Sequence, residues 1–498
     1  MTTHVGVTMS TISTAASSSM PKRHRWWIGA LTTAIFVGVA CLGLWIYRAV
    51  AIANDWRSAE TETDAREPRW RLAELEADRP PIADADNAGL QIIFAHAKSP
   101  KLCVSNVKGY HEIFAKLKPV IQLNSQQIDL IRKQLDLAPA AITEARKLKN
   151  MPHGRFTVRF SLDYGFTQCE DYQRARDISG WLLHDAYHLA QEKRCDEALD
   201  NCQAILNIGR TIGDDRFLSS QLTRIRHQQM ATETAERVLA QGQASQEGLL
   251  ALQLLITCEM AESNWIGSLK GTRAGWHYCF DNLRTGKLTW NPLPRFWFTA
   301  REQMSLLDRM EDQFPQGMLQ HYPAHLRFMN RLIEIAKLPL HGQKTKLNEL
   351  ANRKAEDPLG ALPLSVCVKL HEAELRSQGL LRTTLVALAC ERYRLKHQRW
   401  PATLDVLIAE KLLPALPIDP VDGRLLRYRH DADGIIVYSI GINEKDDQGN
   451  IVRAPLGDQR FVASRHDAIG HDEDVGFRLW NESRRRDVAL PPVVLPSQ

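Results

Sequence analysis

One uncharged run near the start of the chain constrains its fold more than any other feature. Residues 26–47 contain no charged side chain. At 1.5 Å per residue, a helix of this length spans roughly 33 Å, enough to cross the hydrocarbon core of a bilayer. Trp and Tyr stand at both ends of the run, where their amphipathic rings favour the boundary between water and lipid. The sequence therefore predicts a transmembrane helix over residues 26–50, with the lipid bilayer as a partner through residues 26–47.

The charges that flank the run predict its orientation. Lys22, Arg23 and Arg25 precede it, whereas acidic residues are frequent in the segment that follows. By the positive-inside rule, the N-terminus stays in the cytoplasm and the bulk of the chain lies on the other side. We expect a single-pass protein of the inner (cytoplasmic) membrane with an extracytoplasmic body.

Two other interpretations of the run remain open. The first is a cleaved signal peptide, because residues 51–53 read Ala-Ile-Ala and match a cleavage site, although the apolar core of a signal peptide is only about 7–15 residues long. The second is a buried helix of a globular domain, although such helices rarely lack charge over this length. The uncleaved anchor is the main prediction.

Composition excludes several classes of protein. The chain of 498 residues has 63 basic and 58 acidic side chains and a formal net charge of +5, which is too balanced for a protein that mainly binds nucleic acid. Its hydrophobic fraction of 44% excludes a wholly disordered chain, and one long apolar run excludes a polytopic membrane protein. Nine cysteines are too few for a disulfide-stapled miniprotein. Buried free thiols are the default expectation, and Cys258–Cys279 is the one conceivable disulfide.

The hydrophobic pattern predicts a mainly α fold beyond the membrane. Apolar residues recur at helical spacing, in helices of about 15 residues that are joined by short turns. This pattern fits either tetratricopeptide-like hairpins or an irregular α-helical bundle. The predicted segments are a disordered cytoplasmic tail (1–25), the transmembrane helix (26–50), a connector (51–87), an α-helical domain (88–395), a small α+β module (396–482) and a disordered tail (483–498).

One segment inside the helical domain differs from its surroundings. Gly271, Gly275, Gly286 and Pro292 fall within residues 265–294. Glycine and proline are the usual residues of turns, so we expect a long loop with short structured pieces here.

After residue 396 the pattern changes to that of an α+β module. A short helix is followed by residues 416–420, which read Leu-Pro-Ile-Asp-Pro, and by Gly423, a stretch that is too rich in turn residues to be helical. Alternating apolar residues predict strands on both sides of a hairpin loop at residues 431–434. A third strand is expected near residues 475–479, which completes a short antiparallel sheet.

This module resembles the C-terminal region of the major pseudopilin of type II secretion systems over about residues 393–449. The resemblance rests on residues 400–405 (Trp-Pro-Ala-Thr-Leu-Asp) at the end of a helix, on the Leu-Pro-x-Asp-Pro turn followed by Gly423, and on residues 438–441 (Tyr-Ser-Ile-Gly) at the end of a strand. It implies a pseudopilin-like fold for the module.

A wider resemblance connects the module to the rest of the chain. Residues 69–72 (Arg-Trp-Arg-Leu), residues 79–82 (Arg-Pro-Pro-Ile), the helical middle and residues 474–479 (Asp-Val-Gly-Phe-Arg-Leu) are together similar to a family of uncharacterised membrane-anchored proteins typical of planctomycete bacteria. That family has no established activity, so the resemblance implies architecture and not chemistry.

The acidic loop after the second predicted strand is the best candidate site. Ser439, Asn443, Asp446 and Asp447 offer hard oxygen ligands, and Ca²⁺ takes about six to eight oxygens at about 2.3–2.6 Å. Because major pseudopilins bind Ca²⁺ at the corresponding loop, the resemblance implies a calcium site here. The alternative is a solvated acidic turn without a bound ion.

Two histidine pairs have the spacing of a zinc-binding helix. His184 and His188 are four residues apart, and His321 and His325 repeat that spacing. Side chains at i and i+4 share a helix face and can bind Zn²⁺ together. Asp185, however, stands where metalloproteases carry Glu, and no third ligand is evident. Structural histidines are therefore the main interpretation.

The remaining motifs do not predict catalysis. The sequence has no Gly-x-Ser-x-Gly nucleophile elbow and no Gly-rich phosphate loop. Residues 484–486, three consecutive arginines, fit either a solvated tail or a contact with a polyanion.

We therefore expect a non-catalytic, membrane-anchored interaction or scaffold protein of the cell envelope, with a protein partner and no nucleic acid. One alternative is an accessory component of a type II secretion or pilus-like machine. Another is a metal-dependent envelope hydrolase that uses the histidines.

Overall fold

A computed structural model of the chain describes residues 22–100, 110–114, 116–165, 167–215, 217–262, 264–288, 319–352, 361–451 and 473–494. The chain divides into two compact units, residues 1–58 and 59–498. Most of the predicted cytoplasmic tail and the last four residues lie outside the described part.

The first unit contains most of helix α1, Lys22–Arg66. Among the described residues, α1 is the one helix that is long and apolar enough to cross a membrane, and none of its apolar window is buried. Leu31 and Phe36 expose 63% and 76% of their surface. The helix runs beyond the predicted span at residue 50, because residues 51–66 contain several strong helix formers and no proline or glycine.

In the part that the structure describes, the second unit is mainly helical, as predicted, and carries one small sheet. Its helices are α2 (Leu72–Ala77), α3 (Ala88–Ala97), α4 (Tyr110–Phe114), α5 (Ser125–Leu135), α6 (Pro139–Arg146), α7 (Glu170–Gln191), α8 (Cys195–Gly213), α9 (Leu218–Gln241), α10 (Gln246–Ala261), α11 (Asn264–Arg284), α15 (Tyr322–Ala336), α16 (Leu340–Asn352), α17 (Ala361–His397) and α18 (Asp405–Ala409).

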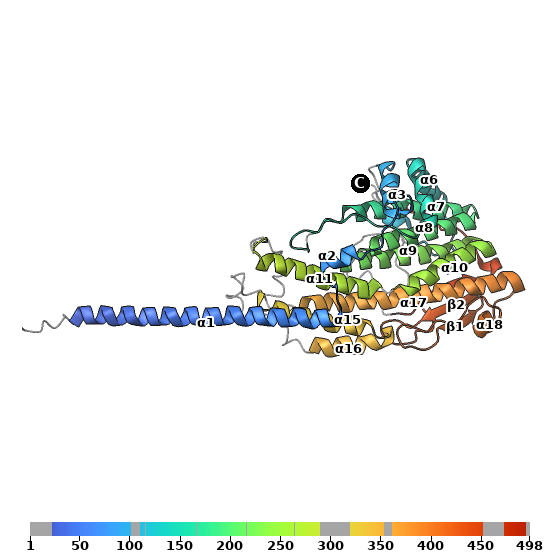
Figure 1. The fold of residues 1–498 in the computed structure, drawn as a ribbon. Helices are drawn as coiled ribbons and strands as arrows, with labels where there is room; N and C mark the ends of the chain where they lie inside the picture. The colour runs from blue at the N-terminus through green and yellow to red at the C-terminus, as the bar shows by residue number, and fades with distance from the viewer. Residues whose placement is uncertain are drawn as a thin grey trace, which may run out of the picture. The chain divides into compact units, whose positions relative to one another are not determined.

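Consecutive helices pack against one another in the middle of this unit. Helix α8 contacts both α7 and α9, and α10 contacts α8 and α17 (Figure 1). A buried ion pair adds to the apolar packing: Glu259 of α10 has no exposed side-chain surface and accepts hydrogen bonds from Arg224 at 2.7 Å and from Arg210 at 2.8 Å. These two arginines come from α9 and α8, so one carboxylate joins three helices.

The sheet consists of β1 (Arg427–Asp431), β2 (Gly434–Ser439) and β3 (Val475–Trp480), in the antiparallel order β1-β2-β3. Val437 in the central strand pairs with Tyr428 on one side and with Phe477 on the other. The predicted hairpin and third strand are thus confirmed. Gly434 is required at the hairpin, because its φ is +153° and a Cβ there would lie 2.0 Å from the carbonyl oxygen of Leu479.

Helix α17 connects the helices to the sheet. It packs against α9, α10 and α16 and also against β2 and β3. One buried hydrophobic cluster extends from Ala88 in α3 to Leu479 in β3. We expected a domain boundary at residue 395, between the helical domain and the α+β module. The hydrophobic core is instead continuous across this position.

We expected a long loop at residues 265–294. This expectation is wrong for residues 265–284, which belong to helix α11, Asn264–Arg284. One of its glycines, Gly275, allows close packing instead of a turn. A Cβ on Gly275 would lie 2.1 Å from the ring of Tyr164, so only glycine leaves room for this aromatic side chain against the helix. Turn propensity could not distinguish this use of glycine from a break in the helix.

The predicted connector after the membrane segment is anchored by polar contacts within the second unit. Trp70 is completely buried and donates its indole N–H to Asp64 at 2.8 Å. Glu67 binds Lys270 at 2.5 Å and Arg273 at 2.7 Å, both from α11. The connector is therefore a docked segment of the body.

The disulfide considered from the sequence is not formed. Cys258 is exposed on α10, whereas Cys279 is buried in α11, and both are free thiols. All the cysteines in the described part of the chain are free. Burial raises the pKa of the Cys279 thiol to about 12, so it stays protonated and inert.

Residues 481–494, here called the C-terminal strap, differ from the disordered tail that we expected. Arg485 donates to the carbonyl of Gly242 at 2.6 Å and to the buried carboxylate of Glu391 at 2.8 Å. Arg486 donates to the carbonyls of Gln191 at 3.1 Å and Gln241 at 3.3 Å. The two arginines thus satisfy unpaired carbonyls at the C-terminal ends of α7 and α9, where a positive charge also complements the helix dipole.

The rest of the strap is held mainly through its backbone. The amide of Asp487 donates to Val120 at 2.8 Å, and the amide of Gln122 donates to Asp487 at 3.0 Å. Further along, the amide of Val493 donates to the side-chain oxygen of Gln126 at 2.9 Å. These contacts tie the end of the chain to the segment that precedes α5.

We expect Arg485→Ala to lower the free energy of unfolding by about 2 kcal/mol, because Glu391 is completely buried and would keep only Arg394 as a charged partner. Arg484→Ala is the matched control. The Arg484 side chain is 62% exposed and pairs with a half-exposed aspartate, so its loss should change stability by less than about 0.5 kcal/mol. Urea unfolding of the two variants makes the comparison, and equal losses would contradict the strap's role.

Candidate functional site

The turn before the sheet is organised by one buried carboxylate. Asp419 has no exposed surface. Its Oδ1 accepts hydrogen bonds from the hydroxyl of Ser439 at 2.8 Å and from the amide of Val421 at 2.9 Å. Its Oδ2 accepts from the amide of Ile440 at 3.0 Å and from Arg427 at 2.5 Å. Asp419 therefore fixes the turn, the start of β1 and the end of β2 relative to one another.

The local sequence explains why the chain turns here. Pro417 and Pro420 cannot donate helical hydrogen bonds, and Gly423 adopts a φ of +74° that favours glycine. The amide of Gly423 donates to the carbonyl of Asp419 at 3.0 Å. The ring of His341 packs against Gly423. A Cβ on residue 423 would lie 3.1 Å from this ring. We did not single out Asp419 as a site residue, although the Asp-Pro pair within the turn motif was a usable signal.

The acidic loop that follows β2 is stabilised by its own side chains. Asn443 donates to Asp447 at 3.0 Å. Asp446 accepts hydrogen bonds from the hydroxyl of Tyr438 at 3.2 Å and from the amide of Gln448 at 2.9 Å. Three of the four predicted calcium ligands, Asn443, Asp446 and Asp447, therefore lie in one tight loop. Each of them already accepts a hydrogen bond through a side-chain oxygen.

The fourth predicted ligand, Ser439, is 1% exposed and donates its hydroxyl to Asp419. Sequence reasoning missed Asp474, which accepts a hydrogen bond from the amide of Gly449 at 2.7 Å. Burial raises the pKa of Asp474, and the carboxylates of Asp446 and the next residue raise it further. Within the described ranges, no three His, Cys, Asp or Glu side chains form a group that could hold a metal. The calcium site stays a prediction.

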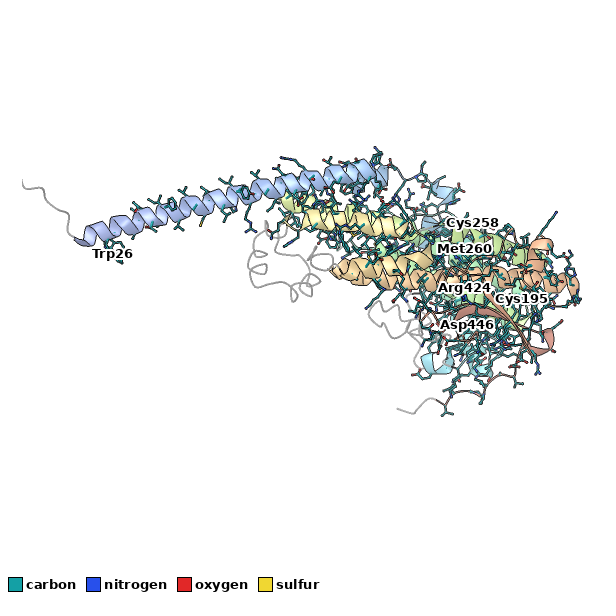
Figure 2. The ribbon with its side chains drawn as sticks, turned by 90° about the horizontal axis from the view of Figure 1, so that it is seen from below. Trp26, Cys195, Cys258, Met260, Arg424 and Asp446 are labelled. Atoms are coloured by element: carbon teal, nitrogen blue, oxygen red, sulfur yellow. The ribbon has the colours of Figure 1, made fainter. Side chains whose placement is uncertain are left out.

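A cavity of about 470 Å³ lies beside this loop, between α16, α17 and the Asp419 turn. Arg424 and Asp446, which line it, are labelled in Figure 2. The lining residues are Leu340, His341, Lys344, Thr345, Leu375, Val421, Asp422, Arg424, Arg427, Ile440, Ile442, Glu444 and Asp446.

Charged residues of both signs surround the cavity, and most of them are paired. Lys344 contacts Glu444 at 2.5 Å, and Arg427 contacts Asp422 at 2.5 Å. Burial lowers the pKa of Arg427, but hydrogen bonding and charge from the neighbouring aspartates outweigh it, so the pKa is raised. Arg424 is different, since its side chain is 83% exposed and lies 4.0 Å from Asp422.

The first histidine pair is used within the core. His184 is buried, with Nδ1 2.6 Å from the carbonyl oxygen of Gly180 and Nε2 2.5 Å from the hydroxyl of Tyr110. Burial lowers the pKa of His184 to about 4, so the ring is neutral at physiological pH. His188 instead lies 3.3 Å from Glu192. Both nitrogens of His184 are thus engaged, which leaves neither free for a metal.

A second buried cluster surrounds Asp215. Tyr172 donates to this carboxylate at 2.8 Å and also contacts the hydroxyl of Ser220, while Arg79 lies 3.7 Å away. Burial raises the pKa of Asp215 to about 7, although the hydrogen bond from Tyr172 and the charge of Arg79 act in the opposite direction. Asp215 is 2% exposed and Ser220 is completely buried, so these groups contribute to the core rather than to an accessible active site.

Comparison with known proteins adds nothing to this picture. No protein-family model, curated protein or solved structure matches the chain. The resemblance of the C-terminal module to pseudopilins therefore stays a prediction from its motifs.

If the acidic loop binds Ca²⁺, the ion should raise the melting temperature of the full chain, because a ligand that binds only the folded state stabilises it by mass action. The double variant Asp446→Asn/Asp447→Asn should lose that rise. Thermal unfolding in detergent with Ca²⁺ and with a chelator makes the measurement. Identical melting curves for the original protein would contradict the site.

The raised pKa of Asp215 predicts a pH dependence of stability. Because the folded state holds this proton up to about pH 7 and the unfolded state releases it near pH 4, stability should fall as pH rises through this window. Between these two pKa values, the free energy of unfolding should fall by about 1.4 kcal/mol per pH unit. Asp215→Asn should remove this contribution.

Urea unfolding between pH 4.5 and pH 8 tests this expectation. Asp136→Asn, at an exposed position, is the matched control and should keep the pH profile of the original protein. A parallel profile for Asp215→Asn and the original protein would show that Asp215 is already charged in the folded state.

Proposed function

We propose that this chain is a membrane-anchored, non-catalytic interaction protein of the bacterial cell envelope. The observation that carries the proposal is helix α1. The described apolar residues of its uncharged run, from Trp26 to Tyr47, are exposed, as they would be against lipid (Figure 2). Exposure of such a long apolar surface to water would be unfavourable by about 25 cal/mol per Å², so a bilayer is the environment that this helix fits.

The charges beside the anchor support an orientation. Three basic residues precede the apolar run, and the positive-inside rule places them in the cytoplasm. The body, residues 59–498, then lies outside the cytoplasm at the inner membrane. The seven cysteines described in the body carry no disulfide, and six of them are buried or half-buried, where oxidants reach thiols slowly.

A binding role suits the body better than a catalytic one. His184 and Asp215, two of the groups with strongly shifted pKa values, both make buried hydrogen bonds within the core. We propose that the successive helices α7, α8 and α9 form a tetratricopeptide-like arrangement, a type of scaffold that binds protein partners.

A second candidate is an accessory role in a type II secretion or pilus-like machine. In its favour, α17 packs across the antiparallel sheet next to the Asp419 turn, which is the arrangement that the pseudopilin resemblance implies. Against assembly by the pilin route, pilins continue one helix from the membrane into this domain, whereas α1 and α17 are separate helices.

The anchor is tested with the double variant Ile35→Arg/Val39→Arg. Each arginine at the centre of a span costs about 2.5–3.5 kcal/mol of insertion free energy, so the variant should leave the membrane fraction while the original protein stays there after alkaline carbonate extraction. Ile35→Leu/Val39→Leu is the apolar control and should remain in the membrane. Recovery of the original protein in the soluble fraction would overturn the proposal.

The partner is sought by crosslinking the full chain in intact cells and identifying the captured proteins by mass spectrometry. Envelope proteins that are lost with the arginine variant would support the proposal. Capture of a secretion ATPase or an outer-membrane channel would favour the second candidate. Capture of cytosolic proteins alone would contradict an extracytoplasmic body.

A further inference from the structure

The cavity beside the acidic loop has the size of a small-ligand site. Its volume of about 470 Å³ falls within the range of about 300–1,000 Å³ that is typical of ligand pockets. Its walls come from segments far apart in the sequence, α16, α17, the Asp419 turn and the loop after β2, and contacts such as Lys344 with Glu444 connect them. The cavity is therefore part of the folded body, and its presence does not depend on the anchor.

The cavity has an aliphatic side. Leu375 of α17 and Ile440 at the end of β2 line it and are both 4% exposed. Leu340, Val421 and Ile442 extend the same kind of surface. A ligand that covers these side chains should itself carry an aliphatic group, because burying apolar surface is the main favourable term at such a wall.

The charged side chains argue against a simple ion as the ligand. Cationic and anionic side chains occur together around the cavity, and Lys344 and Arg427 each contact a carboxylate at 2.5 Å. A free anion would find Lys344 and Arg427 already paired with carboxylates, and a metal ion would find Glu444 and Asp422 already paired with cations. A ligand with a charge of its own, hydrogen-bonding groups and an apolar part complements all three kinds of lining.

Arg424 is the cation best placed to bind a ligand. Its side chain is 83% exposed, and its contact with Asp422 is long at 4.0 Å. The guanidinium group of arginine matches a carboxylate in shape and can donate two hydrogen bonds to it. On the acidic side, Glu444 and Asp446 are exposed and can accept hydrogen bonds from amides or an ammonium group.

We propose that the cavity binds the C-terminal end of a peptide whose last residue is aliphatic. The aliphatic side chain packs against Leu340, Val421 and Ile442, the terminal carboxylate pairs with Arg424, and the acidic loop accepts hydrogen bonds from the peptide amides. This inference names a ligand class for an interaction protein, and it concerns the body alone. A failure of the anchor test would therefore leave it standing, and its own failure would leave the anchor standing.

Binding is measured by isothermal titration of the full chain in detergent micelles with acetyl-Ala-Ala-Leu and with the same peptide as its C-terminal amide. The acid should bind, and the amide should bind about tenfold more weakly, because it loses the charge-assisted hydrogen bonds. Arg424→Ala should weaken binding of the acid by about the same factor and should leave binding of the amide unchanged.

Thr345→Trp provides a blocking variant. Thr345 is exposed on α16 and lines the cavity, so a tryptophan there should fill the space without disturbing the core, and binding of the acid should be lost. Lys346→Trp is the matched control, since Lys346 is exposed on the same helix and is not among the lining residues. It should bind like the original protein, and unchanged melting curves would show that both variants fold.

Three results would overturn the proposal. The first is no heat of binding from the original protein with the acid peptide. The second is equal affinity for the acid and the amide. The third is full binding by Thr345→Trp, which would place the peptide elsewhere on the protein.

Discussion

Helix α17 is covered by other helices and by the sheet, so its polar side chains are buried as well as its apolar ones. The rest of the second unit depends on how these polar side chains are paired. A polar group of a helix that is buried between other helices and a sheet is stabilised by a hydrogen-bond partner. Glu374 accepts a hydrogen bond from Gln221 at 3.1 Å, and Ser377 donates to Gln228 at 2.5 Å. Burial raises the pKa of Glu374, which has amides rather than cations as its partners. These polar contacts fix the register of α17 against α9, which apolar packing alone would define less sharply.

The same helix positions the candidate site. Gly379 of α17 lies against the end of β2, where a Cβ would come 3.2 Å from the hydroxyl of Ser439. The sheet can therefore approach α17 closely, and Ser439 reaches Asp419 behind it. One turn of helix earlier, Leu375 lines the cavity. The cavity between α17, the turn and the acidic loop thus depends on this close helix–sheet contact.

Patterns carried by neighbouring residues could be predicted from the sequence, and contacts between distant residues could not. The apolar run of α1 and the hairpin of β1 and β2 follow from local periodicity and turn chemistry. Gly275 of α11 was misread as a turn residue, because it leaves room for Tyr164, which lies far away in the sequence. The arginines of the strap look solvated in the sequence, since the helix ends that they cap come from other parts of the chain. In the candidate site, the acidic loop was predicted and the turn motif that contains Asp419 was visible, whereas the cavity arises only after the helices meet the sheet.

The strap also determines when the protein can finish folding. Arg486 donates to carbonyls at the ends of α7 and α9, and Asp487 pairs with the backbone near residue 121. The ends of these helices therefore gain these hydrogen bonds only after the last part of the chain has been synthesised. A ribosome that stopped just before residue 485 would release a chain with every described helix and strand but with an open seam. Such a product would differ from the finished protein chiefly in exposed helix ends, and proteases would act on that difference.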